Sequence, residues 1–215
     1  MNIDSAKQIK YEFIEVPANK ISLSKRRKCH GVGINDSAYI TQMRVNGNYT
    51  ICPYYRKWID MLNRCYSKKF HLKNATYIGC TVCDEWLSFL SFKQWMSTQD
   101  WKGNDLDKDL LVQGNKIYSP GTCLFVSPRV NRIIGSKIKR KENIKKGASY
   151  IEKLGKFSSS YYLNGKSHYL GLFNSEDEAH EEYKKVKYRI IYLVAMEQKE
   201  PIKSALLKYN VGENV

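Results

Sequence analysis

Two carboxylates in the stretch LDKDL have a spacing that suits a divalent metal. They are Asp107 and Asp109, separated by Lys108. Residues two apart in a β-strand point to the same face, so in a strand the two carboxylates would share a face and Lys108 would point away. Carboxylate oxygens are ligands that Mg²⁺ prefers. The spacing therefore predicts a metal site without histidine, and the alternative is a pair of solvent-exposed strand charges balanced by lysines.

A hydrolytic site also needs a group that activates water, and no histidine adjoins these carboxylates. Lys108 is a poor base, because lysine has a reference pKa of about 10.4 and neutralising it near pH 7 takes about 4 kcal/mol. As a cation, Lys108 would instead bind phosphate or stabilise charge that develops in the transition state. His30 and His71 are the other histidines in the first two thirds of the chain, and either could supply a base.

The cysteines suggest a second, structural metal site. The chain has six of them: Cys29, Cys52, Cys65, Cys80, Cys83 and Cys123. Cys80 and Cys83 have the two-residue separation that is typical of zinc ligands, and Cys65 and Cys123 precede and follow them. These four thiolates could hold a structural Zn²⁺. The alternative is that the cysteines are free thiols that pack as small apolar groups.

The charge of the chain points to a polyanionic partner. Its 215 residues carry a formal net charge of +15, with a pI near 9.5. A surplus of this size most often indicates nucleic acid, although it also suits a surface that is merely soluble. The charge is clustered in KRRK and in KIKRK, and the side chains expected to contact phosphates there are Lys25, Arg26, Arg27, Lys137, Lys139 and Arg140.

The carboxylates belong to a stretch, residues 106–131, that reads as a strand, a turn-rich loop, a second short strand and the start of a helix. Two helices are predicted upstream. The first begins at Pro53, since proline suits a first helical turn, and the second is capped by Asp84. Apolar residues at helical spacing are expected to be buried: Tyr55, Trp58, Ile59, Leu62 and Tyr66 in the first helix, and Trp86, Phe89, Leu90 and Met96 in the second.

The C-terminal part predicts a sheet covered by one helix. SYIEKL is a first strand, and KFSSSYYLNGKSHYLGLF contains two more, joined by an Asn164-Gly165 turn. A capping box of Ser175 and Glu178 begins a helix. Its apolar stripe is Ala179, Tyr183, Val186, Ile190 and Val194. The fold class expected is α+β: a small ββα module followed by a three-stranded antiparallel sheet with one helix.

Four stretches of the central part, YRKWIDMLNRCY, YIGCTVCDEWLSFLSFKQWM, LDKDLLVQGNKIYSPGTC and VN, resemble phage-type HNH-related (ββα-metal) endonucleases. The resemblance implies cleavage of double-stranded DNA with Mg²⁺ or another divalent metal. It makes Asp107 and Asn131 metal ligands beside Asp109, and Asn115 a brace of the hairpin loop. Lys108 falls where the family carries its base histidine. Related proteins often hold a zinc clamp, which agrees with the cysteine spacing.

Three later stretches, GKF, NGKSHYLGLF and SEDEAHEEY, resemble the AP-two domain of ethylene-response-factor type, which is also found in phage homing endonucleases. In that family the outer face of the sheet enters the major groove. Strand alternation puts these residues against the helix: Ser159, Tyr161, Leu163, His168 and Leu170. The residues expected to face DNA are Ser158, Ser160, Tyr162 and Tyr169, flanked by Lys156 and Lys166, which are also expected to bind DNA. The family usually carries more arginine here, so phosphate contacts are expected before guanine readout.

The expected domains are an N-terminal extension (1–49), an HNH-like module (50–135), a basic linker (136–147), an AP-two-like domain (148–197) and a tail (198–215). The N-terminus lacks the apolar segment of a signal peptide, and no apolar run approaches the roughly 18 residues of a membrane span. The expected location is therefore the cytoplasm, that of a bacterial host if the chain is encoded by a phage.

Two functions fit the domain pair. One is a metal-dependent endonuclease of homing type. The other is a catalytically inactive relative that binds double-stranded DNA as a regulator or as a phage factor against a host defence, with a host or phage protein as a further partner. An RNA-binding protein fits the charge and the tyrosines but not the two domains together.

Overall fold

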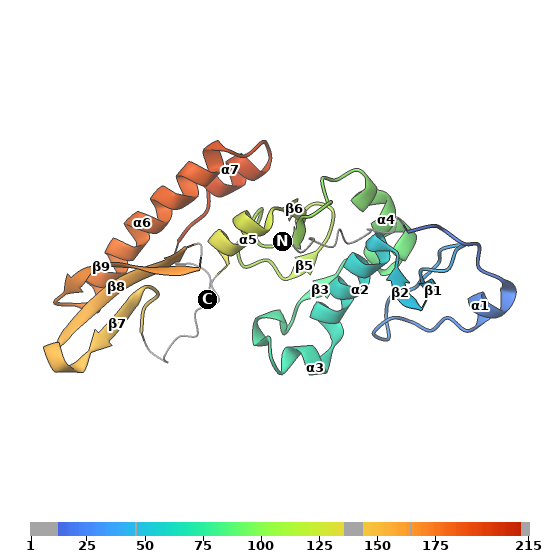
Figure 1. The fold of residues 1–215 in the computed structure, drawn as a ribbon, viewed down its shortest axis with the longest axis horizontal. Coiled ribbons are helices and arrows are strands. Elements are labelled where there is room, and N and C mark those ends of the chain that lie inside the picture. The colour runs from blue at the N-terminus through green and yellow to red at the C-terminus, as the bar shows by residue number, and fades with distance from the viewer. Residues whose placement is uncertain (1–12, 46, 136–143, 164, 212–215) are drawn as a thin grey trace, which may run out of the picture. The chain divides into compact units, whose positions relative to one another are not determined.

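The computed structural model describes residues 13–45, 47–135, 144–163 and 165–211. Helices and small sheets alternate along the chain, so the fold class is α+β, as the sequence predicts (Figure 1). The chain divides into two compact units, Met1–Thr98 and Gln99–Val215. Within the described ranges, none of the helices has the length and apolar character needed to cross a bilayer.

The first half of unit 1 holds a short helix, a hairpin and a longer helix. The short helix α1 (Lys20–Ser24) is followed by the antiparallel strands β1 (Gln42–Val45) and β2 (Asn48–Ile51). Helix α2 (Pro53–Tyr66) begins at the predicted proline. Its buried side chains are Tyr55, Trp58, Met61, Leu62 and Cys65.

The second half of unit 1 consists of short elements and one further helix. They are α3 (Lys68–His71), the 3₁₀ turn η1 (Ala75–Tyr77), β3 (Thr81–Val82), the 3₁₀ turn η2 (Asp84–Leu87) and α4 (Phe89–Ser97). Helix α4 packs against α2. The Trp58 indole donates a hydrogen bond of 2.7 Å to the carbonyl of Trp86, which ties α2 to η2.

The predicted start of this second helix is wrong. Asp84 begins the 3₁₀ turn η2, and α4 is capped instead by Ser88, whose hydroxyl accepts a hydrogen bond of 3.1 Å from the Ser91 amide. Leu90, expected to be buried, is 41% exposed, whereas Trp86 and Phe89 are fully buried. The backbone is extended at Ser88, between η2 and α4. The helical spacing expected across Trp86, Phe89 and Leu90 therefore does not continue through this point, and Leu90 does not share the buried face.

Unit 2 begins with a hairpin and a helix. Strand β4 (Asp105–Asp107) pairs with β6 (Leu124–Val126) in antiparallel fashion, and β5 (Ile117–Tyr118) lies in the connection between them. Helix α5 (Pro128–Ile134) follows directly, with a proline in its first turn and the Ser127 hydroxyl as its N-cap. The order strand, loop, strand, helix is the one predicted for residues 106–131.

A three-stranded antiparallel sheet follows, in the order β7 (Ala148–Ile151), β8 (Lys156–Leu163) and β9 (Lys166–Phe173). The 3₁₀ turn η3 (Glu152–Leu154) joins the first two strands. A register shift between Ser159 and Ser160 of β8 marks a β-bulge. The sheet is therefore the predicted one, with an irregularity that the sequence pattern did not predict.

Two helices complete unit 2. Helix α6 (Glu176–Met196) begins with the predicted capping box, and α7 (Ile202–Leu207) lies in the stretch predicted to be a tail. One core joins the hairpin, α5, α6 and the C-terminal segment. Its buried members include Leu110, Leu124, Val126, Val130, Ile134, Tyr183, Ile191, Val194, Leu206 and Tyr209.

The compact units of the structure differ from the predicted domain boundaries. The expected module 50–135 does not form one compact unit, because the division falls between Thr98 and Gln99. The hairpin packs with α6 and α7 into the C-terminal core, so it belongs to the same unit as the three-stranded sheet. Residues 136–143 of the expected linker lie outside the described residues.

Candidate nucleic-acid interface and metal site

The three-stranded sheet has a face covered by α6 and an opposite face. Helix α6 packs against all three strands, and Tyr161, Leu163 and Leu170 join the core beneath it. Alternation along β8 puts Ser160 and Tyr162 on the opposite face. Tyr169 pairs directly with Ser160 across the two strands, so it lies on that face as well. This is the register that the sequence pattern predicts.

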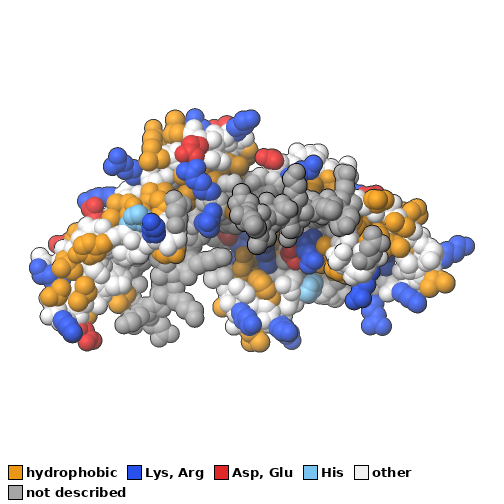
Figure 2. All heavy atoms as spheres, in the orientation of Figure 1, with side chains coloured by type: hydrophobic (Ala, Val, Ile, Leu, Met, Phe, Trp, Pro, Cys, Tyr) orange, Lys and Arg blue, Asp and Glu red, His pale blue; other side chains and the backbone are white. Residues whose placement is uncertain are grey.

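The opposite face, called the open face below, exposes large side chains. Tyr162 is 61% exposed and Tyr169 is 64% exposed, whereas Ser159, on the covered side, is fully buried. Leu172 pairs with Ser158 and is 42% exposed on the same face. In Figure 2, hydrophobic side chains gather over the part of the molecule where Figure 1 draws β7, β8 and β9. Exposed aromatic side chains on one side of a small sheet suggest a binding surface.

Hydroxyl groups and one lysine make up the rest of the open face. Ser149 of β7 pairs with Ser158, whose hydroxyl donates a hydrogen bond of 3.3 Å to the Ser149 carbonyl. Lys156 pairs with Ile151, two residues along from that pair, and so shares the face; its side chain is exposed. The face thus combines aromatic rings, hydroxyls and a cation.

Two exposed residues near the hairpin tip lie on the covered side of the sheet. Lys166 is exposed but pairs with Leu163, so it lies on the covered side of the sheet and not on the open face. His168 also lies on the covered side, yet it is exposed, and its ring stacks on Tyr161 with centroids 4.7 Å apart. The tip of the hairpin is more accessible than simple alternation predicts.

In the β4–β6 hairpin, two carboxylates point toward α5. Asp105 pairs with Val126 and Asp107 pairs with Leu124. Paired residues share a face of the hairpin, and both partners are buried in the core that includes α5. From α5, the Asn131 side-chain amide donates a hydrogen bond of 3.2 Å to Asp105. Asp105 and Asn131 are therefore in contact, and Asp107 lies two residues from Asp105 on the same face of β4.

The Asp107 carboxylate is largely buried and accepts hydrogen bonds from the backbone. Its Oδ1 accepts hydrogen bonds from the backbone amides of Asp109 at 2.9 Å and Leu110 at 2.7 Å. Burial raises the pKa of Asp107, and the neighbouring charge of Asp109 adds to the shift. A cation nearby would favour the ionised form. The oxygen atoms of Asp105, Asp107 and Asn131 are ligands of the type that Mg²⁺ binds, so the residues present fit a divalent cation.

Asp107 and Asp109 do not share the face of one strand, although the sequence predicts that they do. Strand β4 ends at Asp107, so Asp109 lies beyond it and turns toward Lys108. Asp105 takes its place as the carboxylate two residues away on the same face. The sequence NDLDKD has an aspartate two residues before Asp107 as well as two residues after it. Asp105 was missed because the strand was predicted to begin at Leu106, one residue too late.

Lys108 has a structural role that the sequence did not suggest. It is only 6% exposed, and its ammonium group donates to Asp109 at 2.6 Å and to the Asn115 carbonyl at 2.7 Å. The Asn115 side chain in turn donates to the carbonyls of Lys108 at 2.9 Å and Ile117 at 2.7 Å. These bonds close the loop after β4. We assign Lys108 to the loop structure instead of the position of a base.

The four cysteines predicted to bind zinc are mostly buried thiols. Cys65, Cys80 and Cys123 are buried, and Cys83 is partly buried. Burial raises the pKa of Cys83, and it raises that of Cys123 to about 12, which favours neutral thiols. No group of three or more His, Cys, Asp or Glu residues among those described is arranged to hold a metal. A structural Zn²⁺ stays a prediction.

The role of an outside base stays a prediction for both His30 and His71. The Nε2 of His71 lies 2.8 Å from the carbonyl of Arg64 and so fixes the end of α2. His30 lies in a turn with a positive φ of 50°. Both belong to unit 1, whereas the hairpin belongs to unit 2.

The predicted phosphate-binding cluster in unit 1 divides into two kinds of residue. Lys25 and Arg27 are exposed. Arg26 donates hydrogen bonds to three backbone carbonyls instead, those of Asn35, Ser37 and Tyr39. The linker residues predicted to contact phosphates lie outside the described residues: Lys137, Lys139 and Arg140. On the face drawn in Figure 2, Lys and Arg side chains are spread over both units, whereas Asp and Glu are sparse.

Comparison with family models, with curated proteins and with solved structures finds no match to this chain. The likeness to HNH-related endonucleases and to AP-two domains therefore stays a prediction from sequence. Function has to be argued from the two sites themselves.

Proposed function

We propose that this protein binds double-stranded DNA through the open face of the β7–β9 sheet. The observation that carries the proposal is the outward projection of Tyr162 and Tyr169, 61% and 64% exposed, from a sheet whose other side is covered by α6. A small domain gains nothing in folding from displaying two aromatic rings to water. Binding of a partner would bury both rings, and that burial would stabilise the complex.

The chemistry of the surroundings favours DNA over a protein partner. The net charge of +15 attracts a polyanion at long range. On the face itself, Lys156 and the serine hydroxyls of Ser158 and Ser160 are donors that suit phosphate oxygens and base edges. Strands are known to enter DNA grooves, and the major groove is wide enough for a two-stranded ribbon such as β8 and β9. The AP-two resemblance points to the same mode of binding.

The proposal is tested by removing both rings while keeping the strands. Tyr162→Thr with Tyr169→Thr retains β-branched residues that suit a strand. Affinity for duplex DNA should fall about tenfold, which corresponds to about 1.4 kcal/mol. Tyr192→Ala is the matched control, because Tyr192 is 54% exposed on α6. Fluorescence anisotropy with a labelled duplex measures the difference. Equal affinity for the double variant and the control would refute the open-face proposal.

A second function, metal-dependent cleavage of DNA, is favoured by the contact of Asn131 with Asp105 and by Asp107 on the same face of β4. A divalent cation bound there would polarise a scissile phosphate and supply activated water. The residues of the chain would hold the cation and orient it, with Asp107 kept in place by two backbone amides. The geometry assigns no side chain to the role of general base. A protein that binds DNA without cutting it, as a regulator or phage factor, is the alternative.

Cleavage is tested with plasmid DNA in Mg²⁺ or Mn²⁺, with EDTA as the negative control. Asp107→Asn should abolish cutting and weaken Mn²⁺ binding, which calorimetry follows independently of activity. Lys108→Arg should preserve both, because its cation belongs to the loop. If the wild type binds DNA but neither cuts it nor binds Mn²⁺, the hairpin serves only as a support and the DNA-binding function stands alone.

A further inference from the structure

A pocket of about 310 Å³ lies in unit 1, between α1 and the β1–β2 hairpin. Its lining residues are Ser22, Lys25, Arg26, Arg27, Asn35, Ile40, Thr41, Gln42 and Tyr55. Three are cations and none is a carboxylate. The remaining polar groups are hydroxyls and side-chain amides. A concave site of this size that is rich in donors and contains no acid suits an anion.

Arg26 supplies a fixed positive charge to this pocket. Its guanidinium donates three hydrogen bonds to backbone carbonyls, at 2.9 Å to Asn35, at 2.7 Å to Tyr39, and to Ser37. A guanidinium has five N–H donors, so two remain after these three bonds. The charge itself is not neutralised by carbonyl groups. Within the described ranges, no carboxylate forms an ion pair with Arg26.

Lys25 and Arg27 flank this fixed charge and are exposed. Among the ion pairs formed by described residues, none includes either of them. Three neighbouring cations repel one another, and the repulsion is relieved when an anion binds between them. Phosphate recognition commonly combines a bidentate arginine with more mobile lysine charges, and both types are present here.

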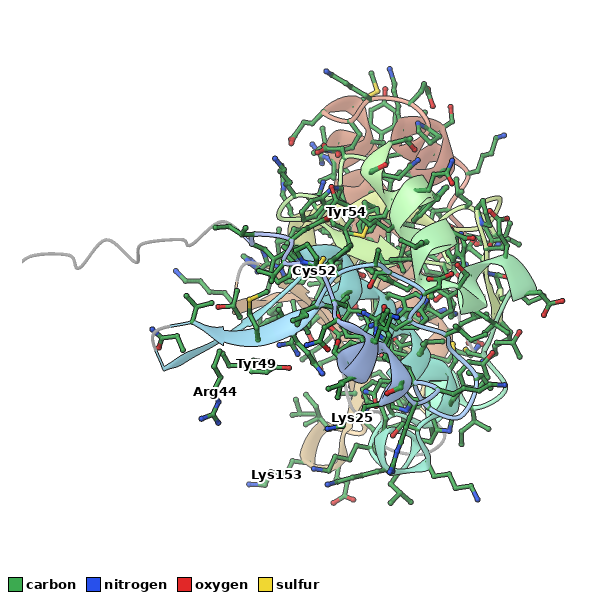
Figure 3. The ribbon with its side chains drawn as sticks, turned by 90° about the vertical axis from the view of Figure 1, so that its right-hand side faces the viewer. Lys25, Arg44, Tyr49, Cys52, Tyr54 and Lys153 are labelled. Carbon is green, nitrogen blue, oxygen red and sulfur yellow. The ribbon has the colours of Figure 1, made fainter. Side chains whose placement is uncertain are left out.

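One face of the β1–β2 hairpin adjoins the pocket at Gln42. Gln42 lines the pocket, and Arg44, two residues later in β1, lies on the same side of the strand. Arg44 pairs with Tyr49, whose hydroxyl donates to the Gln42 side chain. Tyr49 is 58% exposed. Figure 3 shows Arg44 and Tyr49 projecting from the same side of the hairpin.

We propose that this pocket binds a phosphate of a nucleic-acid backbone, and that Arg44 and Tyr49 contact the adjoining nucleotide. Arg26 is the fixed part of the site, Lys25 and Arg27 provide the mobile charges, and the tyrosine ring stacks on a sugar or base. Unit 1 thereby contributes a second DNA contact, separate from the sheet of unit 2. The inference rests on the proposed function for the identity of the polymer, since the charge of the pocket itself calls only for an anion.

The test uses the full chain carrying Lys25→Ala and Arg27→Ala. The logarithm of the binding constant for duplex DNA falls with the logarithm of salt concentration, with a slope of about 0.9 for each phosphate contacted. The double variant should lower that slope by about 0.9, the value for one phosphate contact, and adding Arg44→Ala, which removes the contact to the adjoining nucleotide, should lower it further. Lys68→Ala with Lys69→Ala is the matched control, because both lysines are exposed in α3 of the same unit. A slope unchanged from wild type, or lowered equally by the control, overturns the proposal.

Two further arms identify the ligand and separate this inference from the open-face proposal. The slope is measured again in the background Tyr162→Thr with Tyr169→Thr. If those tyrosine changes leave affinity intact while the pocket variant still lowers the slope, the open-face proposal fails and this one stands.

Inorganic phosphate is titrated alone, with the indole and phenol fluorescence as readout. Phosphate binding that the pocket variant abolishes, together with an unchanged DNA slope, would make the ligand a free anion and refute the nucleic-acid assignment.

Discussion

The β4–β6 hairpin and the β7–β9 sheet both place polar residues on antiparallel strands beside a helix, but they use those residues differently. In the hairpin, polar groups bond to one another: Lys108 to Asp109, and Asn131 to Asp105. On the open face of the sheet, Tyr162 and Tyr169 project into solvent. The polar groups of the hairpin stabilise the fold, whereas the tyrosines of the open face are available to a binding partner.

The difference shows why residue type alone is a poor guide to chemistry. A lysine between two aspartates suggests a catalytic group, yet in this fold it closes a loop. The strand alternation that puts Tyr162 and Tyr169 on the outer face is what the structure has, and they are the most exposed aromatic residues of the sheet. Substitutions in the hairpin should therefore change the free energy of unfolding, whereas substitutions on the open face should change binding. The predictions below follow this order, from the largest effect on stability to the smallest.

Lys108→Ala should lower the free energy of unfolding by about 2 kcal/mol. The change leaves the Asn115 carbonyl without its donor and Asp109 without its partner, in a position where the lysine was 6% exposed. The exposed Lys102 serves as control, and Lys102→Ala should change stability by less than about 0.5 kcal/mol. Urea denaturation monitored by circular dichroism measures both. Similar midpoints for the two variants would show that the loop does not depend on this cation.

Asp107→Ala should lower the free energy of unfolding by about 1–2 kcal/mol, because two backbone amides lose their acceptor. Asp107→Asn keeps an oxygen in that position and removes a charge that burial disfavours. It should therefore be nearly as stable as wild type. Both changes should weaken Mn²⁺ binding at the hairpin. If the asparagine variant is as unstable as the alanine variant, the carboxylate is stabilised by its charge and not by accepting these bonds.

Lys187 tests the covered side of α6. It lies four residues from both Tyr183 and Ile191, on the buried stripe, and burial lowers its pKa to about 8, with the charge of Lys146 adding to the shift. The folded state then favours the neutral amine. Between pH 8 and the ordinary value of 10.5, the unfolded chain binds the proton and the folded chain does not, so stability should rise with pH.

Lys187→Met should abolish that rise and stabilise the protein at pH 7 by on the order of 1 kcal/mol, after allowance for solvent screening. Lys199→Met is the control, since Lys199 is exposed beyond the end of α6. Thermal unfolding at pH 7, 9 and 10 gives the measurement. If stability changes with pH in the same way for wild type and Lys187→Met, burial of the Lys187 charge does not destabilise the folded protein.

The elements that could be predicted were those encoded locally. The capping box of Ser175 and Glu178 and the regular apolar stripe placed α6 correctly. Alternation in β8 and β9 gave the right faces for Tyr162 and Tyr169, because period two is a strong signal in a long strand. The proline at position 53 marked the start of α2. In each case a few neighbouring residues carry the information.

The features that were missed depend on boundaries or on distant contacts. Strand β4 has only three residues and ends at Asp107, so Asp109 falls two residues beyond it and Asp105 is the carboxylate that shares a strand face with Asp107. The role of Lys108 depends on Asn115, seven residues away across a loop. The unit boundary follows from packing of the hairpin against α6 and α7, which no local pattern encodes. Hence the candidate site could be located to within a few residues from the sequence, but its chemistry could not be assigned.

The smallest effect on stability should come from Tyr162→Thr with Tyr169→Thr. Both rings lie mostly in solvent, so little buried apolar area is lost, and threonine suits a strand as well as tyrosine does. The free energy of unfolding should change by less than about 0.5 kcal/mol, while affinity for duplex DNA falls about tenfold. Urea denaturation and anisotropy on the same preparation give both quantities. A large loss of stability would mean that the rings support the sheet. The tyrosines of the open face would then contribute to folding as the polar residues of the hairpin do, and the two regions would not differ in this respect. A stable variant with weakened binding assigns the exposed tyrosines to recognition, because a residue that contributes nothing to folding but much to affinity acts through the bound state alone.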